Sequence, residues 1–166
     1  MWNQPTFDFG LGKSGADWLI INDGVMGGLS QGRVSLTDSS LLYSGRISLK
    51  NNGGFSSLRS RFSPMDLSTF ETVTIRFRSQ GQPFAFVLET SRVWYEPSYR
   101  YQFAAADDDW KTVTMNLSEF KETRIGRETG QRISKNQLGD VIRLGFINAG
   151  KYESEFVLEI DYITFE

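Results

Sequence analysis

Alternation of apolar and polar residues with a period of two is the feature of this sequence that most constrains its fold. The segment Thr72-Val-Thr-Ile-Arg-Phe-Arg78 places its three apolar residues on one side and its threonines and arginines on the other. Residues 156–160 repeat the pattern near the end of the chain. Because successive side chains of a strand point to opposite faces of a sheet, each segment predicts a strand with one buried face.

Strand candidates of this kind occur along the whole chain, separated by turn signals such as Asn-Asn-Gly-Gly and Ala-Asp-Asp-Asp. The further candidates are residues 33–37, 42–49, 55–62, 84–90, 99–104, 111–116 and 141–148. Helical periodicity is weak, and short helical turns are expected at residues 66–70, 118–120 and 134–138. The pattern predicts an all-β fold, a sandwich of about nine or ten mainly antiparallel strands with less than about 15% helix.

The size and charge of the chain limit its class. With 166 residues it is expected to form one domain, spanning 1–166, with a core that needs no disulfides. Its 18 basic and 20 acidic residues give a net charge of -2, which provides no overall attraction to nucleic acid. A run of about 18 apolar residues is missing, so no membrane span is predicted.

The chain contains no cysteine and no histidine. Disulfides, thiolate nucleophiles, Cys-type zinc sites and histidine-dependent triads are therefore excluded, whereas carboxylate chemistry and calcium binding remain open. The sequence has no nucleophile motif and no EF-hand spacing, so we predict no enzyme activity, no cofactor and no metal site. Because the first residues form neither a secretion signal nor an Arg-rich transit peptide, a cytoplasmic location is expected.

Several sequence blocks stand out beside the alternation. Trp18 is followed by Asp23-Gly-Val-Met-Gly-Gly-Leu-Ser30, Gly45-Arg-Ile-Ser48, Asn51-Asn-Gly-Gly-Phe-Ser-Ser-Leu-Arg59, Trp110-Lys-Thr-Val113 and Phe156-Val-Leu-Glu-Ile-Asp-Tyr-Ile163. Together these blocks resemble the family of the complex I intermediate-associated protein, CIA30. The resemblance implies a galactose-binding-domain-like jelly roll and a role as an assembly chaperone for respiratory complex I. It also implies a bacterial member, because the transit peptide of mitochondrial members is missing.

Two glycine-rich segments are predicted to be structural loops. One contains Asp23, Gly24, Gly27 and Gly28, and the other contains Asn51, Asn52, Gly53 and Gly54. The first lacks the Lys-Ser/Thr ending of a phosphate-binding loop, so we expect a tight reversal in which Gly27 or Gly28 has a positive φ. Asn-Gly in the second segment is typical of a hairpin turn, although its amides could also contact a sugar.

Aromatic residues between two strand candidates suggest a binding surface. Trp94 and Tyr95 fall in a loop, where exposed rings stack on sugars or anchor protein interfaces, and a buried Trp94 is an equal alternative. Tyr99 and Tyr101 follow directly. A concave pocket lined by Trp94, Tyr99 and Tyr101 would favour carbohydrate, whereas a broad flat patch would favour a protein partner.

Arginine placement suggests a second surface. In residues 55–62, Leu58 and Phe62 are expected to face inward with Ser56 and Ser60. The candidates on the outward side are Arg59 and Arg61, with Arg76 and Arg78 on the next strand. If these strands pair, four guanidinium groups share one sheet face, where an acidic protein segment or another anion would dock with Trp94 as apolar anchor. A solvated face, neutralised by nearby carboxylates, is the alternative.

The remaining polar segments suggest no chemistry. Residues 121–137 are predicted to form a long surface connection, the kind of loop in which binding residues often lie. Asp107-Asp-Asp109 reads as an acidic turn, and Glu159 and Asp161 are the carboxylates that a calcium site would use. We therefore predict a non-enzymatic protein-binding module, with a carbohydrate-binding module as the alternative and a carboxylate-dependent hydrolase as a weaker third class.

Overall fold

The computed structural model of the protein describes residues 6–10, 17–22, 24 and 27–166. Within these residues the chain forms thirteen strands. They are β1 (Thr6–Asp8), β2 (Leu19–Asn22), β3 (Gln31–Leu36), β4 (Leu41–Ile47), β5 (Ser56–Arg59), β6 (Thr72–Gln80), β7 (Phe84–Glu89), β8 (Ser98–Phe103), β9 (Lys111–Asn116), β10 (Lys121–Arg124), β11 (Arg127–Arg132), β12 (Arg143–Asn148) and β13 (Ser154–Phe165). The helical segments are η2 (Lys50–Asn52), η3 (Leu117–Glu119) and α1 (Lys135–Leu138).

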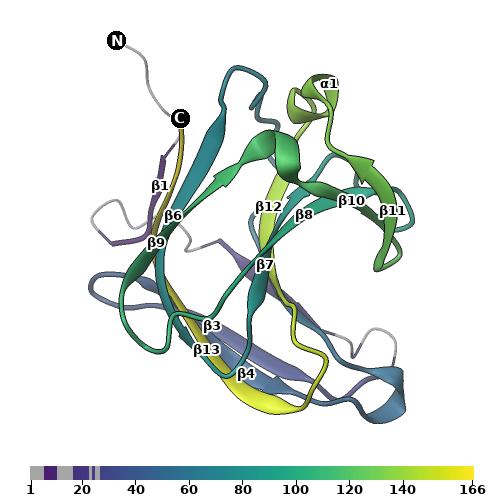
Figure 1. The fold of residues 1–166 in the computed structure, drawn as a ribbon. Helices are drawn as coiled ribbons and strands as arrows, with labels where there is room; N and C mark the ends of the chain where they lie inside the picture. The colour runs from purple at the N-terminus through teal and green to yellow at the C-terminus, as the bar shows by residue number, and fades with distance from the viewer. Residues whose placement is uncertain (1–5, 11–16, 23, 25–26) are drawn as a thin grey trace.

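The strands form two sheets that pack against each other (Figure 1). One sheet has six strands in the order β3-β4-β13-β6-β9, with β1 also paired to β13. The other has seven strands in the order β11-β10-β8-β7-β12-β5-β2. The pairings between these strands are all antiparallel. The arrangement confirms the predicted all-β jelly-roll sandwich.

The core lies between the two sheets, and the alternation in the sequence explains which side chains form it. In β6 the residues Val73, Ile75 and Phe77 are buried, whereas the threonines and arginines between them are partly exposed. Phe77 meets Phe103 of the other sheet edge to face, with ring centroids 4.9 Å apart. Burying one large apolar side chain contributes about 1.5–3 kcal/mol, so this aromatic core is the main source of stability.

The structure has more strands than expected, and the additional ones lack a clear apolar alternation. Residues 121–137, predicted to be a surface connection, contain β10, β11 and the first three residues of α1. β11 is exposed along its whole length, so no burial pattern marks it in the sequence. The turns expected at 118–120 and 134–138 are present as η3 and α1, and α1 begins with a capping box between Ser134 and Gln137.

The two glycine-rich loops both cross from one sheet to the other. Gly27 has a φ of 86° and its N–H donates to the carbonyl of Gly24 at 3.1 Å, which confirms the predicted positive φ. Asp23 lies outside the described residues, so its role stays a prediction. The second loop joins β4 of one sheet to β5 of the other, with φ of 55° at Asn51 and 133° at Gly54. The predicted hairpin turn is wrong here, because a hairpin joins neighbouring strands of one sheet.

Candidate binding face

The four arginines predicted to share one sheet face do not lie on one sheet. Arg59 belongs to β5, which pairs with β12 and β2. Arg76 and Arg78 belong to β6, which pairs with β13 and β9. Arg61 lies beyond the end of β5, in a largely exposed ion pair with Asp17 at 3.4 Å between Nε and Oδ2. The predicted four-arginine face is therefore wrong, because alternation orients residues within a strand without selecting its neighbours.

On the outer face of the six-stranded sheet, each arginine has its own carboxylate. Arg76 Nη1 lies 2.8 Å from Asp161 Oδ2. Arg78 donates from Nε and Nη2 to Glu159 Oε1, at 3.0 and 2.9 Å. The ring of Trp110 lies against both guanidinium groups, 4.7 and 4.9 Å from its centroid. These contacts neutralise the two arginines locally, and they engage the carboxylates that a calcium site would have used.

The four aromatic candidates do not form one surface. Trp94 and Tyr95 lie in the loop between β7 and β8, where they are 78% and 53% exposed and contact each other edge to face. Tyr99 and Tyr101 lie on the inner face of β8, where burial raises the pKa of Tyr99 to about 12 and Tyr101 packs on Phe120. The prediction that Tyr99 and Tyr101 line a surface with Trp94 is therefore wrong, because their side chains belong to the core.

The outer face of the seven-stranded sheet carries a different set of arginines. The strand register places four residues in one row across neighbouring strands: Arg59 of β5, Gly145 of β12, Val87 of β7 and Arg100 of β8. The next row on the same face pairs Arg143 of β12 with Glu89 of β7. Residues directly opposite each other in an antiparallel sheet share a face, so three arginines and one glutamate meet on this surface.

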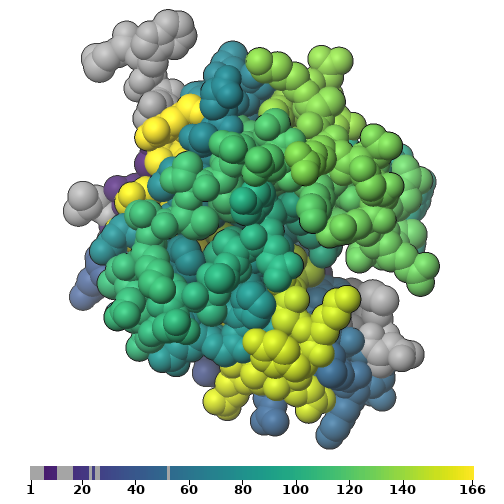
Figure 2. Space-filling view, in the orientation of Figure 1, coloured from purple at the N-terminus to yellow at the C-terminus, as the bar shows by residue number. Residues whose placement is uncertain are grey.

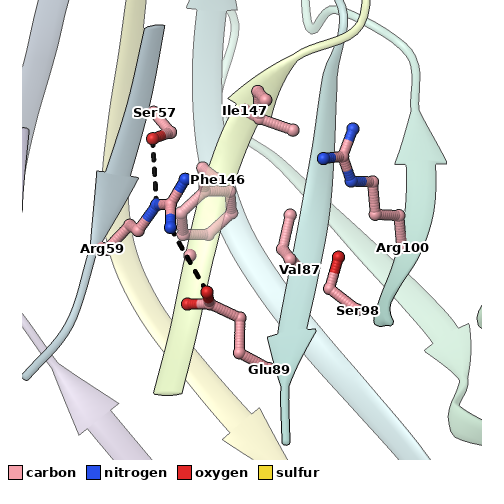
Figure 3. A pocket seen from close by; sticks show the side chains of 9 residues that line it. Ser57, Arg59, Val87, Glu89, Ser98, Arg100, Phe146 and Ile147 are labelled. Carbon is pink, nitrogen blue, oxygen red and sulfur yellow. Dashed lines mark hydrogen bonds and ion pairs between the residues drawn. The ribbon is translucent and has the colours of Figure 1, made fainter. Parts of the chain in front are cut away.

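This surface is concave, and we call it the concave face. In Figure 1 the hairpin of β10 and β11 curls away from the rest of the sheet, and Figure 2 shows an indented outline beside it. At its centre lies a cavity of about 40 Å³ (Figure 3). The cavity is lined by polar side chains, by the aliphatic Val87 and Ile147, and by Gly145 and the fully buried Phe146. The polar residues are Ser57, Arg59, Glu89, Ser98 and Arg100. The absence of a side chain at Gly145 lets Arg59 lie close to β12 there.

Glu89 serves two of the arginines at once. Its Oε1 lies 3.2 Å from Arg59 Nη1 and 2.9 Å from Arg143 Nη2, and its Oε2 accepts from Arg143 Nε. The ring of Phe62 lies under the guanidinium groups of Arg143 and Arg92, at 4.1 and 4.3 Å. Phe62 therefore contacts the arginines of the outer surface, and the expectation that it faces inward is wrong.

Arg100 is left without a carboxylate of its own. The ion pairs found among the described residues do not include it, and its buried Nε has no hydrogen-bond partner among them. Burial, and then the positive charge of Arg59, lower the pKa of Arg100, while Glu89 partly opposes this. Burial also lowers the pKa of Arg59. The centre of the concave face is thus a partly desolvated region with excess positive charge.

Arg100, Arg143 and Glu89 are the residues that the sequence interpretation missed. The signal for Arg100 was present, because Tyr99, Tyr101 and Phe103 alternate with Ser98, Arg100 and Gln102. Reading the aromatic set as the inner face would have placed Arg100 outward. No comparable signal identifies Arg143 and Glu89 as partners of Arg59, since they lie on different strands far apart in the sequence.

The concave face lacks several features of other kinds of site. No aromatic side chain occupies an outward position on the seven strands of this sheet as described. In the described part of the chain, no group of three or more acidic residues could hold a metal ion. No helix in those residues is long and apolar enough to cross a membrane.

Comparison with known proteins identifies relatives of both the sequence and the fold. The family described as Complex I intermediate-associated protein 30 (CIA30) matches residues 7–160. A family 11 carbohydrate-binding module of a cellulosomal cellulase from Clostridium thermocellum is similar in fold, with a TM-score of 0.70, 14% identity, and coverage of 99% of this chain and 95% of that one. The xylan-binding module CBM86 of Roseburia intestinalis gives a TM-score of 0.52 at 11% identity, covering 99% and 96% of the two chains. At such identities these structures show a shared fold.

Proposed function

Because this chain belongs to the family of the complex I intermediate-associated protein 30, we propose that it is a protein-binding module of the assembly-factor type. The concave face is its binding surface. We propose no catalytic step, since Glu89 is held by two arginines and no second carboxylate of the described residues lines the cavity. A cytoplasmic location stays a prediction.

The observation that carries this proposal is the surplus of arginine on a face whose outward strand positions, in the described residues, carry no aromatic side chain. Arg59 and Arg143 share Glu89 there, and Arg100 has no carboxylate of its own among the described residues. The aliphatic side chains of Val87 and Ile147 lie beside them. Sugar-binding surfaces commonly stack a ring against each sugar, and the described strands of the concave face present no outward ring for this purpose, since Phe62 is covered by Arg92 and Arg143. Arginine beside aliphatic side chains is instead typical of a protein interface.

Carbohydrate binding remains the second candidate, and one observation favours it. The fold is that of carbohydrate-binding modules, one of which was solved with a mixed-linked β-1,3-1,4 tetrasaccharide, at a TM-score of 0.63 and 14% identity. Trp94 and Tyr95 are the exposed rings that could stack on such a ligand. They lie in a loop at the rim, where a sugar would have to bind beside the concave face.

Two outward-facing valines in central strands provide a matched test. Val87 lies on the concave face in β7, and Val157 lies on the outer face of the six-stranded sheet in β13. We expect Val87→Trp to cover the cavity and abolish partner binding, whereas Val157→Trp leaves it intact. Both variants should keep the melting temperature of the wild type within a few degrees, because surface substitutions cost little.

The measurement is capture from native extract, followed by direct binding of each purified partner to all three chains. Subunits of NADH:ubiquinone oxidoreductase are the expected partners, from the family to which the chain belongs. A glycan array is run on the same three proteins. Partner binding that survives Val87→Trp and is lost in Val157→Trp would contradict the proposed surface, and glycan binding lost in Val87→Trp would favour the second candidate.

A further inference from the structure

We propose that Arg59 and Arg100 form a carboxylate-binding site at the centre of the concave face. Its occupant is an acidic side chain of an extended, otherwise apolar segment of a protein partner. The proposal rests on the proposed function of the concave face as a protein-binding surface. It goes further by assigning a ligand chemistry to two named side chains.

The first argument is the balance of charge. The two oxygens of Glu89 accept three hydrogen bonds from Arg59 and Arg143, so its single negative charge is already shared by two arginines. Arg100 lines the same cavity and brings a further positive charge without a further carboxylate. A ligand carboxylate would bring the ratio of carboxylates to arginines closer to the one-to-one pairing on the other sheet.

The second argument is an unsatisfied donor. The Nε of Arg100 is buried and has no hydrogen-bond partner among the described residues. Buried donors are almost always paired, so an orphaned one at a cavity points to a group that binds there. Arginine presents a planar fork of N–H groups that matches a carboxylate closely.

The third argument is the space between the two arginines. Figure 3 shows Arg59 and Arg100 on either side of Val87, with the cavity between them. One water needs roughly 10–15 Å³ of such space, so a cavity of about 40 Å³ accommodates the two oxygens and the carbon of a carboxylate. Ser57 and Ser98 also line it, and Ser57 Oγ accepts from Arg59 Nε at 3.0 Å, which orients that guanidinium group.

The surroundings of the cavity favour a peptide over an acidic sugar. Val87 and Ile147 line the cavity, and Leu19 and Ile21 face outward on β2, beyond Arg59 and Ser57. These aliphatic side chains suit the apolar side chains of an extended segment. Trp94 lies in the loop that joins the end of β7 at Glu89 to the start of β8 at Ser98, at one end of the face. Its side chain is 78% exposed, so it is able to contact such a segment.

The test uses two blocked synthetic peptides of equal length, one alternating valine with glutamate and one alternating valine with glutamine. A trimer of galacturonic acid is the third probe, which carries carboxylates on a sugar. Binding to the wild-type chain, to Arg100→Leu and to Arg76→Leu is measured by calorimetry and by the side-chain Nε–H resonance of Arg100. Arg76 is the matched control, an arginine on the outer face of the other sheet.

We expect the wild-type chain to bind the glutamate peptide at least about tenfold more tightly than the glutamine peptide, with the Arg100 resonance shifting as it binds. The preference should vanish in Arg100→Leu and persist in Arg76→Leu.

Three results would overturn the proposal: no difference between the two peptides, a preference that survives in Arg100→Leu, or tighter binding of the galacturonic acid trimer than of the peptide. Its failure is distinct from failure of the proposed function. If Val87→Trp abolishes partner binding while Arg100→Leu preserves it, the face binds protein without a carboxylate site. If Val87→Trp preserves partner binding, the proposed function itself fails.

Discussion

The outer faces of the two sheets use arginine in opposite ways. On the six-stranded sheet, Arg76 and Arg78 each have a separate carboxylate and share the ring of Trp110. On the seven-stranded sheet, three arginines meet around Glu89 alone. The backbone geometry is the same antiparallel pairing in both, so the difference arises from which side chains the register brings together. One face is satisfied within the chain, and the other has capacity for an outside anion.

The energetic consequence follows from burial. Arg78 is 37% exposed and water can solvate it if its carboxylate is lost, whereas Arg143 is 9% exposed and cannot be solvated in this way. Partly buried charges cost free energy unless they are paired, and removing one partner leaves that cost uncompensated. The two faces should therefore respond differently to the same substitution, which allows the comparison to be tested.

The largest expected difference is between Glu89→Gln and Glu159→Gln. Glu89→Gln leaves Arg59, Arg100 and Arg143 without a carboxylate on the concave face, so we expect a loss of about 3 kcal/mol in the free energy of unfolding. Glu159→Gln removes the carboxylate paired with Arg78, while the amide oxygen of the glutamine can still accept from Ser40 Oγ, so we expect a loss of about 1 kcal/mol. Urea unfolding measures both. Equal losses would mean that the two faces do not differ as described.

The next comparison expects changes of opposite sign in the free energy of unfolding. Arg100→Leu removes a partly buried charge that has no carboxylate of its own, and we expect the free energy of unfolding to rise by about 1 kcal/mol. Arg78→Leu removes an arginine that is paired with Glu159 and stacked on Trp110, and we expect the free energy of unfolding to fall by about 1 kcal/mol. The midpoint of urea unfolding reports both, provided that its slope is unchanged. A destabilised Arg100→Leu would show that this arginine contributes to folding and would weaken its assignment as a ligand-binding group.

The smallest difference concerns the tryptophan beside each face. Trp110 contacts two guanidinium groups, so Trp110→Ala should cost about 1 kcal/mol. Trp94 is 78% exposed, so Trp94→Ala should change the free energy of unfolding by less than about 0.5 kcal/mol. Thermal unfolding of the two variants separates these expectations. A clear loss in Trp94→Ala would indicate that the loop packs more firmly than its exposure implies.

Prediction from sequence succeeded where burial imposes a local pattern. The alternation of Val73, Ile75 and Phe77 identified β6 and its inner face, because one side of that strand meets the core and the other does not. The positive φ of Gly27 was predictable for a similarly local reason, since glycine has no Cβ and tolerates that backbone conformation. β11 was not predictable in this way, because a strand exposed on both sides has no pattern to read.

The candidate site shows which features a local sequence pattern does not determine. Alternation by itself determined that Arg59, Arg76 and Arg78 point away from the core. Only the tertiary structure decided that β5 pairs with β12 and β6 with β13, which separates Arg59 from the other two and places it beside Glu89 and Arg143. The physical reason is that side-chain direction has a period of two within each strand, whereas strand pairing depends on contacts between segments far apart in the chain.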